Sequence, residues 1–222
     1  MKDTARRQLM KDILTASVGL FLFAFGTYLT IQANLGTAPW DTFNLGLSGT
    51  FGIRYGTASI LVSLVILGID ILMKEKIGIG MFLDAFICGK AVDLFNAIGL
   101  VPAQTRLLPS LAILTAGLFI MGWSMYYYMK TGLGCGPRDT LLVGLSRRLP
   151  RIPIGVISIA ILATVALIGR LLGGPIGIGT LLCAGLIGPV MQLEFHLLRF
   201  DATAVRHRDL VETGRVLFPG KN

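Results

Sequence analysis

Six apolar segments, each long enough to cross a lipid bilayer, are the feature that most constrains how this chain can fold. They cover residues 13–33, 57–73, 79–100, 108–129, 154–172 and 178–198. A membrane-spanning helix needs about 20 predominantly apolar residues. Only 14% of the residues are charged, against about 25% in an ordinary soluble protein, so a soluble globular fold is excluded. The sequence predicts an all-α polytopic membrane protein with six transmembrane helices.

The basic residues predict how the chain is oriented in the membrane. With the N-terminus in the cytoplasm, 16 of the 20 Lys and Arg residues fall in segments on that side; Arg54, Arg106 and Arg170 fall outside, and Lys90 lies within a span. Positive charge concentrates in cytoplasmic loops. We therefore expect a membrane protein with both termini in the cytoplasm and an uncleaved signal anchor as its first span. The net charge of +8 is then a topology signal, and no nucleic-acid partner is expected.

An internal repeat divides the chain into two halves. The sequence LGTAPWDT at residues 35–42 aligns with LGCGPRDT at residues 133–140, at an offset of 98. After one extra residue the offset becomes 99, which aligns Gly56 with Gly155 and Gly89 with Gly188. Each half holds three spans, and because three is odd the second copy enters the membrane from the opposite side. Such inverted repeats are typical of secondary transporters, whose binding sites lie between the copies.

The repeat also predicts the organisation of the chain. A basic cytoplasmic N-terminus, residues 1–12, precedes membrane repeat 1 at residues 13–105. Membrane repeat 2, residues 106–198, is followed by a basic cytoplasmic tail of residues 199–222. The cations of this tail are Arg199, Arg206, Arg208, Arg215 and Lys221.

A Gly-Pro-Asp motif in each half breaks the chain between its first and second spans. The segments 39–50 and 137–149 are too short to cross a bilayer, so we expect short helices that are re-entrant or interfacial, one near each face. Asp41 and Asp139 fall in the first turns, where each carboxylate can cap its helix. Alternatively, the motifs line opposite ends of one pathway, because broken helices at membrane depth occur only beside a cavity or within protein.

Trp40 and Arg138 occupy the same motif position but differ in chemistry. Trp40 is expected to be an interfacial aromatic residue on the outer side. Arg138, on the inner side, either contacts an anion or lipid phosphate or supplies only the positive charge typical of that side. The substrate-pathway candidates are Trp40, Asp41, Thr42, Lys90, Asp93, Arg138, Asp139 and Thr140.

Charged residues within spans are costly and are candidates for function. Lys90 and Asp93 share a helix face and can pair at a spacing of three residues, either as a structural lock or as part of a substrate path. Asp84 points the opposite way and is expected to be solvated at the interface. Asp70 is expected to form an ordinary surface pair with Lys74.

The remaining polar and aromatic groups have simple explanations. Water should reach Gln192, Glu194 and His196 at the cytoplasmic end of the last span, so no metal site is expected there. Met121, Trp123, Met125 and residues 126–128 are interpreted as an aromatic belt, with a stacking surface for a ligand as the alternative. Cys88, Cys135 and Cys183 are interpreted as small buried apolar residues, not as a disulfide framework or a zinc site.

The paired motifs resemble those of a known family. LGTAPWD followed by LGLS in the first half, LGCGPRDTLLVGLSRR in the second and GGPIGIGTLL before the last span are similar to the YczE branch of the YczE/YyaS/YitT group of bacterial integral membrane proteins. The resemblance covers residues 13–198. It implies a multi-pass protein of the bacterial cytoplasmic (inner) membrane, and no catalytic residue can be carried over from it.

The motif search favours transport over catalysis. The sequence contains no HExxH, GxSxG or Walker motif, so we expect no enzyme, no catalytic residue, no cofactor and no metal. The leading hypothesis is a secondary transporter or permease for a small polar or anionic solute, working by alternating access of the inverted repeats. The alternative is a non-catalytic membrane scaffold or accessory subunit without a cavity between the repeats. The expected partners are the lipid bilayer and this solute, with a homo-oligomer left open.

Overall fold

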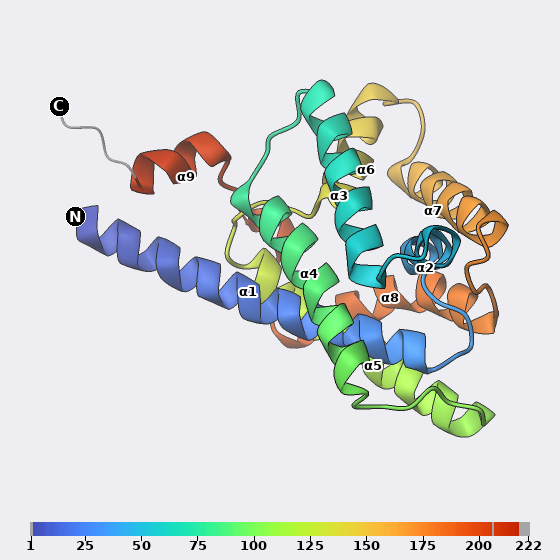
Figure 1. Cartoon of the computed structure of the whole chain (residues 1–222). Helices are drawn as coiled ribbons and strands as arrows, with labels where there is room; N and C mark the ends of the chain where they lie inside the picture. Colours follow the sequence, from blue (N-terminus) through green and yellow to red (C-terminus); the bar gives the residue numbers. More distant parts are fainter. Residues whose placement is uncertain (1, 206, 218–222) are drawn as a thin grey trace.

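The computed structural model describes residues 2–205 and 207–217, and all regular secondary structure in these ranges is helical (Figure 1). The helices are α1 (Lys2–Gln32), α2 (Pro39–Phe51), α3 (Tyr55–Leu72), α4 (Ile79–Ile98), α5 (Leu107–Met129), α6 (Pro137–Arg148), α7 (Ile154–Leu171), α8 (Ile178–Leu197), the 3-10 turn η1 (Ala202–Ala204) and α9 (Leu210–Leu217). The predicted all-α class is confirmed for this part of the chain. Of the predicted tail, Arg206 and residues 218–222, with Lys221 among them, lie outside the described residues.

Five of the described helices are long and apolar enough to cross a membrane: α1, α3, α5, α7 and α8. They coincide with five of the six predicted segments. The sixth segment, residues 79–100, corresponds to α4, which has 20 residues. This helix carries Asp84, Lys90 and Asp93 and does not meet the same criterion. The membrane crossing of α4 therefore stays a prediction.

Two glycines shape the turns that lead into the short helices α2 and α6. Gly36 has a φ of +94° and Gly134 a φ of +110°, in the left-handed region that favours glycine. Pro39 and Pro137 then begin α2 and α6, at a helical position where the missing amide proton costs no hydrogen bond. The local sequence thus explains why each half contains a helix of only 13 or 12 residues between its longer ones.

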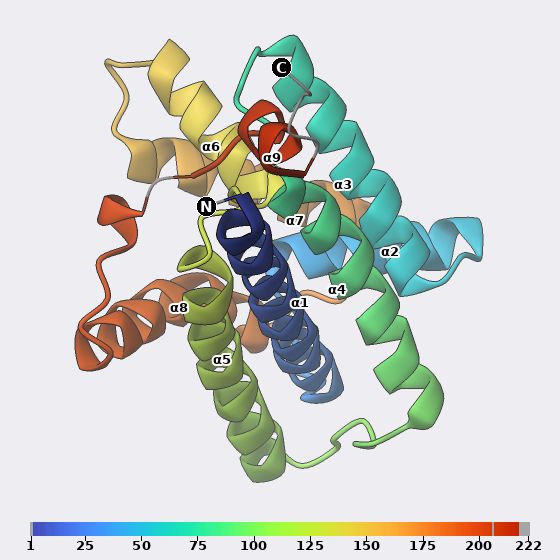
Figure 2. The ribbon, with the colours of Figure 1, turned by 90° about the vertical axis from the view of Figure 1, so that its left-hand side faces the viewer.

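Helices α1 and α5 lie side by side (Figure 2), in a close contact, the α1–α5 crossing, that is built on glycines. A Cβ atom on Gly26 would lie 2.8 Å from the carbonyl oxygen of Gly117, and one on Gly19 would lie 3.1 Å from that of Ser124. Small residues at such contacts let helix backbones approach closely in a membrane. Around this crossing, α4 packs on α1 and α8 packs on α5, while α2 contacts α7 and α3.

The buried apolar side chains and the exposed ones occupy different parts of the fold. One buried cluster lies between α1, the start of α3 and α4, and consists of Ala24, Tyr28, Leu29, Tyr55, Ala91, Val92 and Phe95. Helices α7 and α8 instead expose many large apolar side chains, among them Ile159, Leu167, Leu171, Leu181 and Leu193. Such a surface is unfavourable in water and suits contact with lipid.

Two carboxylates expected near water are buried. Asp70 has no exposed surface, and no hydrogen bond or ion pair reaches its carboxylate from the described residues, so the predicted pair with Lys74 is wrong. The reason is its place on the buried stripe of α3, which also carries Ser63 and Ile66. Glu194 is 2% exposed and lies against Gly122 of α5, where the missing side chain leaves room for it.

The described part of the C-terminal tail packs on the protein. The Arg208 amide donates a hydrogen bond to the Gly132 carbonyl (2.7 Å), and the Leu210 amide donates to the Ile77 carbonyl (2.8 Å). The Arg208 guanidinium also pairs with Asp12 of α1 at 3.2 Å. Because α9 then contacts α1, the two ends of the described chain lie on the same side of the fold, as Figure 1 shows.

Filling the α1–α5 crossing should destabilise the fold. Gly26→Val places methyl groups against Gly117 and Met121, and overpacking of this kind costs about 1–3 kcal/mol. We expect a clear drop in the thermal unfolding temperature of the detergent-solubilised protein. Gly68→Val on α3 is the matched control, because no atom lies within 4 Å of a Cβ added there. Equal unfolding temperatures for the two variants would contradict a tight crossing.

Candidate functional site

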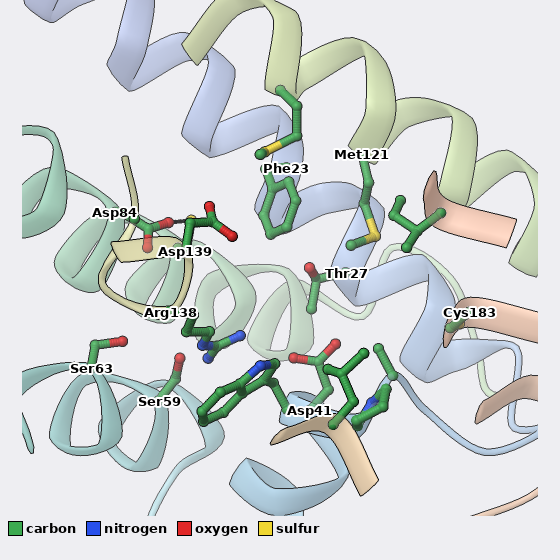
Figure 3. Close-up of a pocket in the computed structure, with 18 of the residues that line it drawn as sticks. Phe23, Thr27, Asp41, Ser59, Ser63, Asp84, Met121, Arg138, Asp139 and Cys183 are labelled. Atoms are coloured by element: carbon green, nitrogen blue, oxygen red, sulfur yellow. Dashed lines mark hydrogen bonds between the residues drawn. The ribbon is translucent and has the colours of Figure 1, made fainter. Parts of the chain in front are cut away.

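A cavity of about 330 Å³ lies between the two halves of the protein (Figure 3). Each of the helices α1 to α8 contributes to its wall. This volume falls at the lower end of the range of small-molecule binding sites. Most of the wall is apolar, and four charged side chains project into it: Asp41, Asp84, Arg138 and Asp139.

Both Gly-Pro-Asp motifs reach this cavity. Trp40 and Asp41 come from α2, and Arg138 and Asp139 come from α6. The guanidinium carbon of Arg138 lies 5.0 Å from the centroid of the Trp40 ring, which is a cation–π contact. Trp40 therefore lines the cavity, where an interfacial aromatic residue was expected, and the placement of one motif near each membrane face stays a prediction. The two motifs meet, because α2 packs on α7 and α6 packs on α3.

Asp41 is held in the cavity wall by a tyrosine. It is 4% exposed, and its Oδ1 atom accepts a hydrogen bond from the Tyr55 hydroxyl at 2.7 Å. No side-chain hydrogen bond caps α2, whose N-cap residue is Ala38. Burial raises the pKa of Asp41, while Arg138 and the Tyr55 hydrogen bond act against this rise. The capping interpretation thus does not account for where this carboxylate lies.

Asp84 and Asp139 project into the cavity near each other (Figure 3). The Cys88 thiol donates a hydrogen bond to Asp84 Oδ1 at 3.3 Å. Asp84 was expected at the membrane interface; it is instead partly buried and lines the cavity inside the protein. Desolvation by the surrounding protein raises the pKa of Asp139 to about 6, with Asp84 adding to the rise and Arg138 opposing it.

The other pathway candidates lie outside the cavity wall. Thr42 is a fully buried residue of α2, and its hydroxyl lies 3.0 Å from the Thr37 hydroxyl. The Thr140 hydroxyl donates to the Gly136 carbonyl at 3.1 Å.

Lys90 is exposed on α4, and no ion pair joins it to Asp93. Asp93 instead accepts a hydrogen bond from the Gly56 amide at 2.8 Å, at the start of α3.

Several wall residues were not anticipated as part of a site. Tyr55 was not anticipated, because its contact with Asp41 depends on the turn between α2 and α3. Tyr128, Met121 and Met125 were interpreted as an aromatic belt, yet they line the cavity, whereas Trp123 is 46% exposed. Among the described residues, no group of three or more His, Cys, Asp or Glu side chains is arranged to hold a metal ion.

Comparison with known proteins places this geometry in a family context. The model of a family of unknown function, DUF6198, matches residues 10–195. The chain is 32% identical over 178 residues to the "Uncharacterized membrane protein YczE" of Bacillus subtilis (strain 168). The aligned region covers 79% of this chain and 81% of that protein. It is 31% identical over 183 residues to the "Uncharacterized protein YyaS" of the same strain, covering 79% and 88%.

A third relative is an "Uncharacterized protein" of Haemophilus influenzae (strain ATCC 51907 / DSM 11121 / KW20 / Rd), which is 29% identical over 188 residues and covers 85% of each chain. No solved structure matches the chain. The resemblance to the YczE/YyaS group that the motifs indicate is confirmed.

Removing the Tyr55 hydroxyl should destabilise the protein through Asp41. In Tyr55→Phe the buried carboxylate loses its hydrogen bond, which costs about 1–3 kcal/mol. Thermal unfolding in detergent should therefore begin at a lower temperature. Tyr127→Phe is the control, because the contacts of that side chain are made by its ring. An unfolding temperature equal to that of the control would argue against a structural role for this hydrogen bond.

Proposed function

The chain belongs to DUF6198, a family of unknown function, and we propose that it is a secondary transporter or permease for a small polar solute. In this proposal it is a non-enzymatic protein of the bacterial cytoplasmic membrane with both termini inside. The observation that carries the proposal is the cavity on which both Gly-Pro-Asp motifs converge. A scaffold needs no such cavity, so this feature favours transport.

The composition of the cavity wall supports an inverted repeat. Wall residues fall into pairs related by the two sequence offsets. At an offset of 98 these are Leu20 with Leu118, Phe23 with Met121, Thr27 with Met125, Trp40 with Arg138, and Asp41 with Asp139. At an offset of 99 they are Ser59 with Ser158, Asp84 with Cys183, Cys88 with Ile187, and Val92 with Met191. A cavity built in this way lies between the repeats, as substrate sites of repeat-built transporters do.

The contacts between the halves obey the same relation. At an offset of 98, Gly19 is equivalent to Gly117 and Gly26 is equivalent to Ser124. The contact of Gly19 with Ser124 is therefore the repeat equivalent of the contact of Gly26 with Gly117. The loops that precede the two Gly-Pro-Asp motifs accept equivalent hydrogen bonds. The Gly80 amide donates to the Leu133 carbonyl (2.9 Å), and its counterpart, the Gly179 amide, donates to the Leu35 carbonyl (2.7 Å).

One part of the fold departs from this symmetry. Helices α3 and α4 pack together, and a Cβ on Gly56 would clash with the carbonyl of Gly89. The equivalent helices α7 and α8 are not closely packed, and nothing lies within 4 Å of a Cβ on either Gly155 or Gly188. Alternating access requires such an asymmetry, because the two repeats exchange conformations between the inward-open and outward-open states.

Transport by reconstituted vesicles tests the proposal. Purified protein in liposomes should move at least one solute of a panel of radiolabelled amines, zwitterions and carboxylates faster than empty liposomes do. Asp139→Asn should lower that rate at least about tenfold, because it removes a charge from the cavity. Asp209→Asn is the control, since the amide oxygen can still accept the hydrogen bond from the Glu212 amide. A panel on which wild type and empty liposomes agree would refute the proposal.

Cross-linking tests the exchange of conformations. In a background where Cys88, Cys135 and Cys183 are replaced by Ala, Gly155→Cys with Gly188→Cys should form a disulfide in one of the two alternating states. The yield should change when the transported solute is added. Gly155→Cys with Leu186→Cys is the control, because residue 186 points about 200° away from residue 188 around the helix. Absence of the cross-link under all conditions, or equal yields for both pairs, would contradict alternating access.

A further inference from the structure

The charges on the cavity wall do not balance. Asp41, Asp84 and Asp139 supply three carboxylates, and Arg138 is the only basic side chain on the wall formed by the described residues. The Tyr55 hydroxyl satisfies one oxygen of Asp41. From the part of the chain that the structure describes, no ion pair reaches Asp84 or Asp139, which share the end of the cavity formed by α4 and α6.

An unbalanced carboxylate is unfavourable beside a mostly apolar protein wall, even where part of its surface is exposed, as it is for Asp84 and Asp139. Taking an ionised group out of water costs several kcal/mol unless a charge of opposite sign compensates it. Arg138 can compensate one carboxylate, and its guanidinium also stacks on Trp40. The cavity therefore attracts positive charge, in the form of either a proton or a ligand.

A second observation at the same end points to a ligand. Tyr128 lines the cavity and is 3% exposed, yet its hydroxyl has no hydrogen-bond partner among the described residues. Buried hydroxyl groups are normally hydrogen-bonded, because an unsatisfied one costs about 1–3 kcal/mol. A ligand with N–H groups at this end could use the Tyr128 oxygen as an acceptor beside the two carboxylates.

The rest of the wall selects the kind of cation. Phe23, Met121, Met125 and Met191 line the same cavity as Asp84 and Asp139. Methionine side chains adapt to apolar groups of different shape. The described residues offer no three-ligand group for a metal ion, and a small hydrated ion would leave this apolar surface unused. An organic cation with an apolar body fits both parts of the cavity.

We propose that the cavity binds a small amine as its ammonium ion, with the charged nitrogen between Asp84 and Asp139 and the apolar part against the methionines. This inference rests on the proposed transport function and narrows its solute from any polar molecule to a cation. An anion is disfavoured, because it would meet three carboxylates for one guanidinium.

Ligand binding by the purified, detergent-solubilised protein tests this assignment without requiring transport. The chain has two tryptophans, so Trp123→Phe leaves Trp40 in the cavity as the fluorescent reporter. Butylammonium, butyrate and 1-butanol are titrated separately, since they share a four-carbon body and differ in charge. We expect a saturable change in emission with butylammonium only.

Variants that remove a negative or a positive charge from the cavity make the test more specific. Asp139→Asn and Asp84→Asn should each weaken butylammonium binding at least about tenfold, whereas Arg138→Gln should tighten it severalfold by removing a repulsive charge. A merely structural role of these residues would not produce this reversal. Asp209→Asn, outside the cavity, should leave the affinity unchanged.

The outcomes separate the ligand assignment from the transport function. A saturable response to butyrate instead of butylammonium overturns the cation assignment, and so does a butylammonium response that neither Asp variant alters, or no response at all. If butylammonium binds as expected but vesicles transport no solute, the ligand assignment stands and the proposed transport function fails. If vesicles transport a carboxylate, transport stands and the cation assignment fails.

Discussion

The close crossing of α1 and α5 is the contact on which the rest of the fold depends. Glycine at residues 19, 26 and 117 lets the two longest helices approach until backbone atoms touch. In a membrane this packing replaces the hydrophobic effect as a source of cohesion, because lipid is as apolar as the helices. Since α4 packs on α1 and α8 packs on α5, the crossing also sets the distance between the halves and hence the space left for the cavity.

A second constraint comes from the breaks between the long helices at α2 and α6. The amides and carbonyls at the ends of α2 and α6 need partners or water. The glycine-rich loops provide some of them, as the bonds from Gly80 to Leu133 and from Gly179 to Leu35 illustrate. The motif side chains Trp40, Asp41, Arg138 and Asp139 line the cavity. The repeated motif therefore has two linked consequences: it ends helices and it brings charge to the centre.

The sequence predicted those features that depend on local chemistry. Gly-Pro spacing predicted α2 and α6, and apolar length predicted the five helices that are long and apolar enough to cross a membrane, together with a sixth, α4, whose crossing stays a prediction. Helical periodicity correctly separated Asp84 from Asp93 but could not say which face is buried, so Asp84 was misassigned. Tyr55 escaped notice because its contact with Asp41 depends on the turn between α2 and α3. Lys90 was predicted to be a pathway residue because it is a charged residue within a span, yet its side chain is exposed. A long lysine side chain can extend from an apolar segment toward polar surroundings.

The two halves share their motif turns but bring different side chains to equivalent positions on the cavity wall. The two ends of the cavity therefore differ in charge. Equivalent positions hold Trp40 and Arg138 in one case, and Asp84 and Cys183 in the other. In the proposed transport mechanism the two halves exchange conformations, while the side chains that face the cavity are free to differ between them. Under the proposed cation assignment, Asp84 and Asp139 hold the charged part of the ligand at one end of the cavity. On these proposals the repeated backbone serves movement, and the different side chains at these few positions serve selectivity.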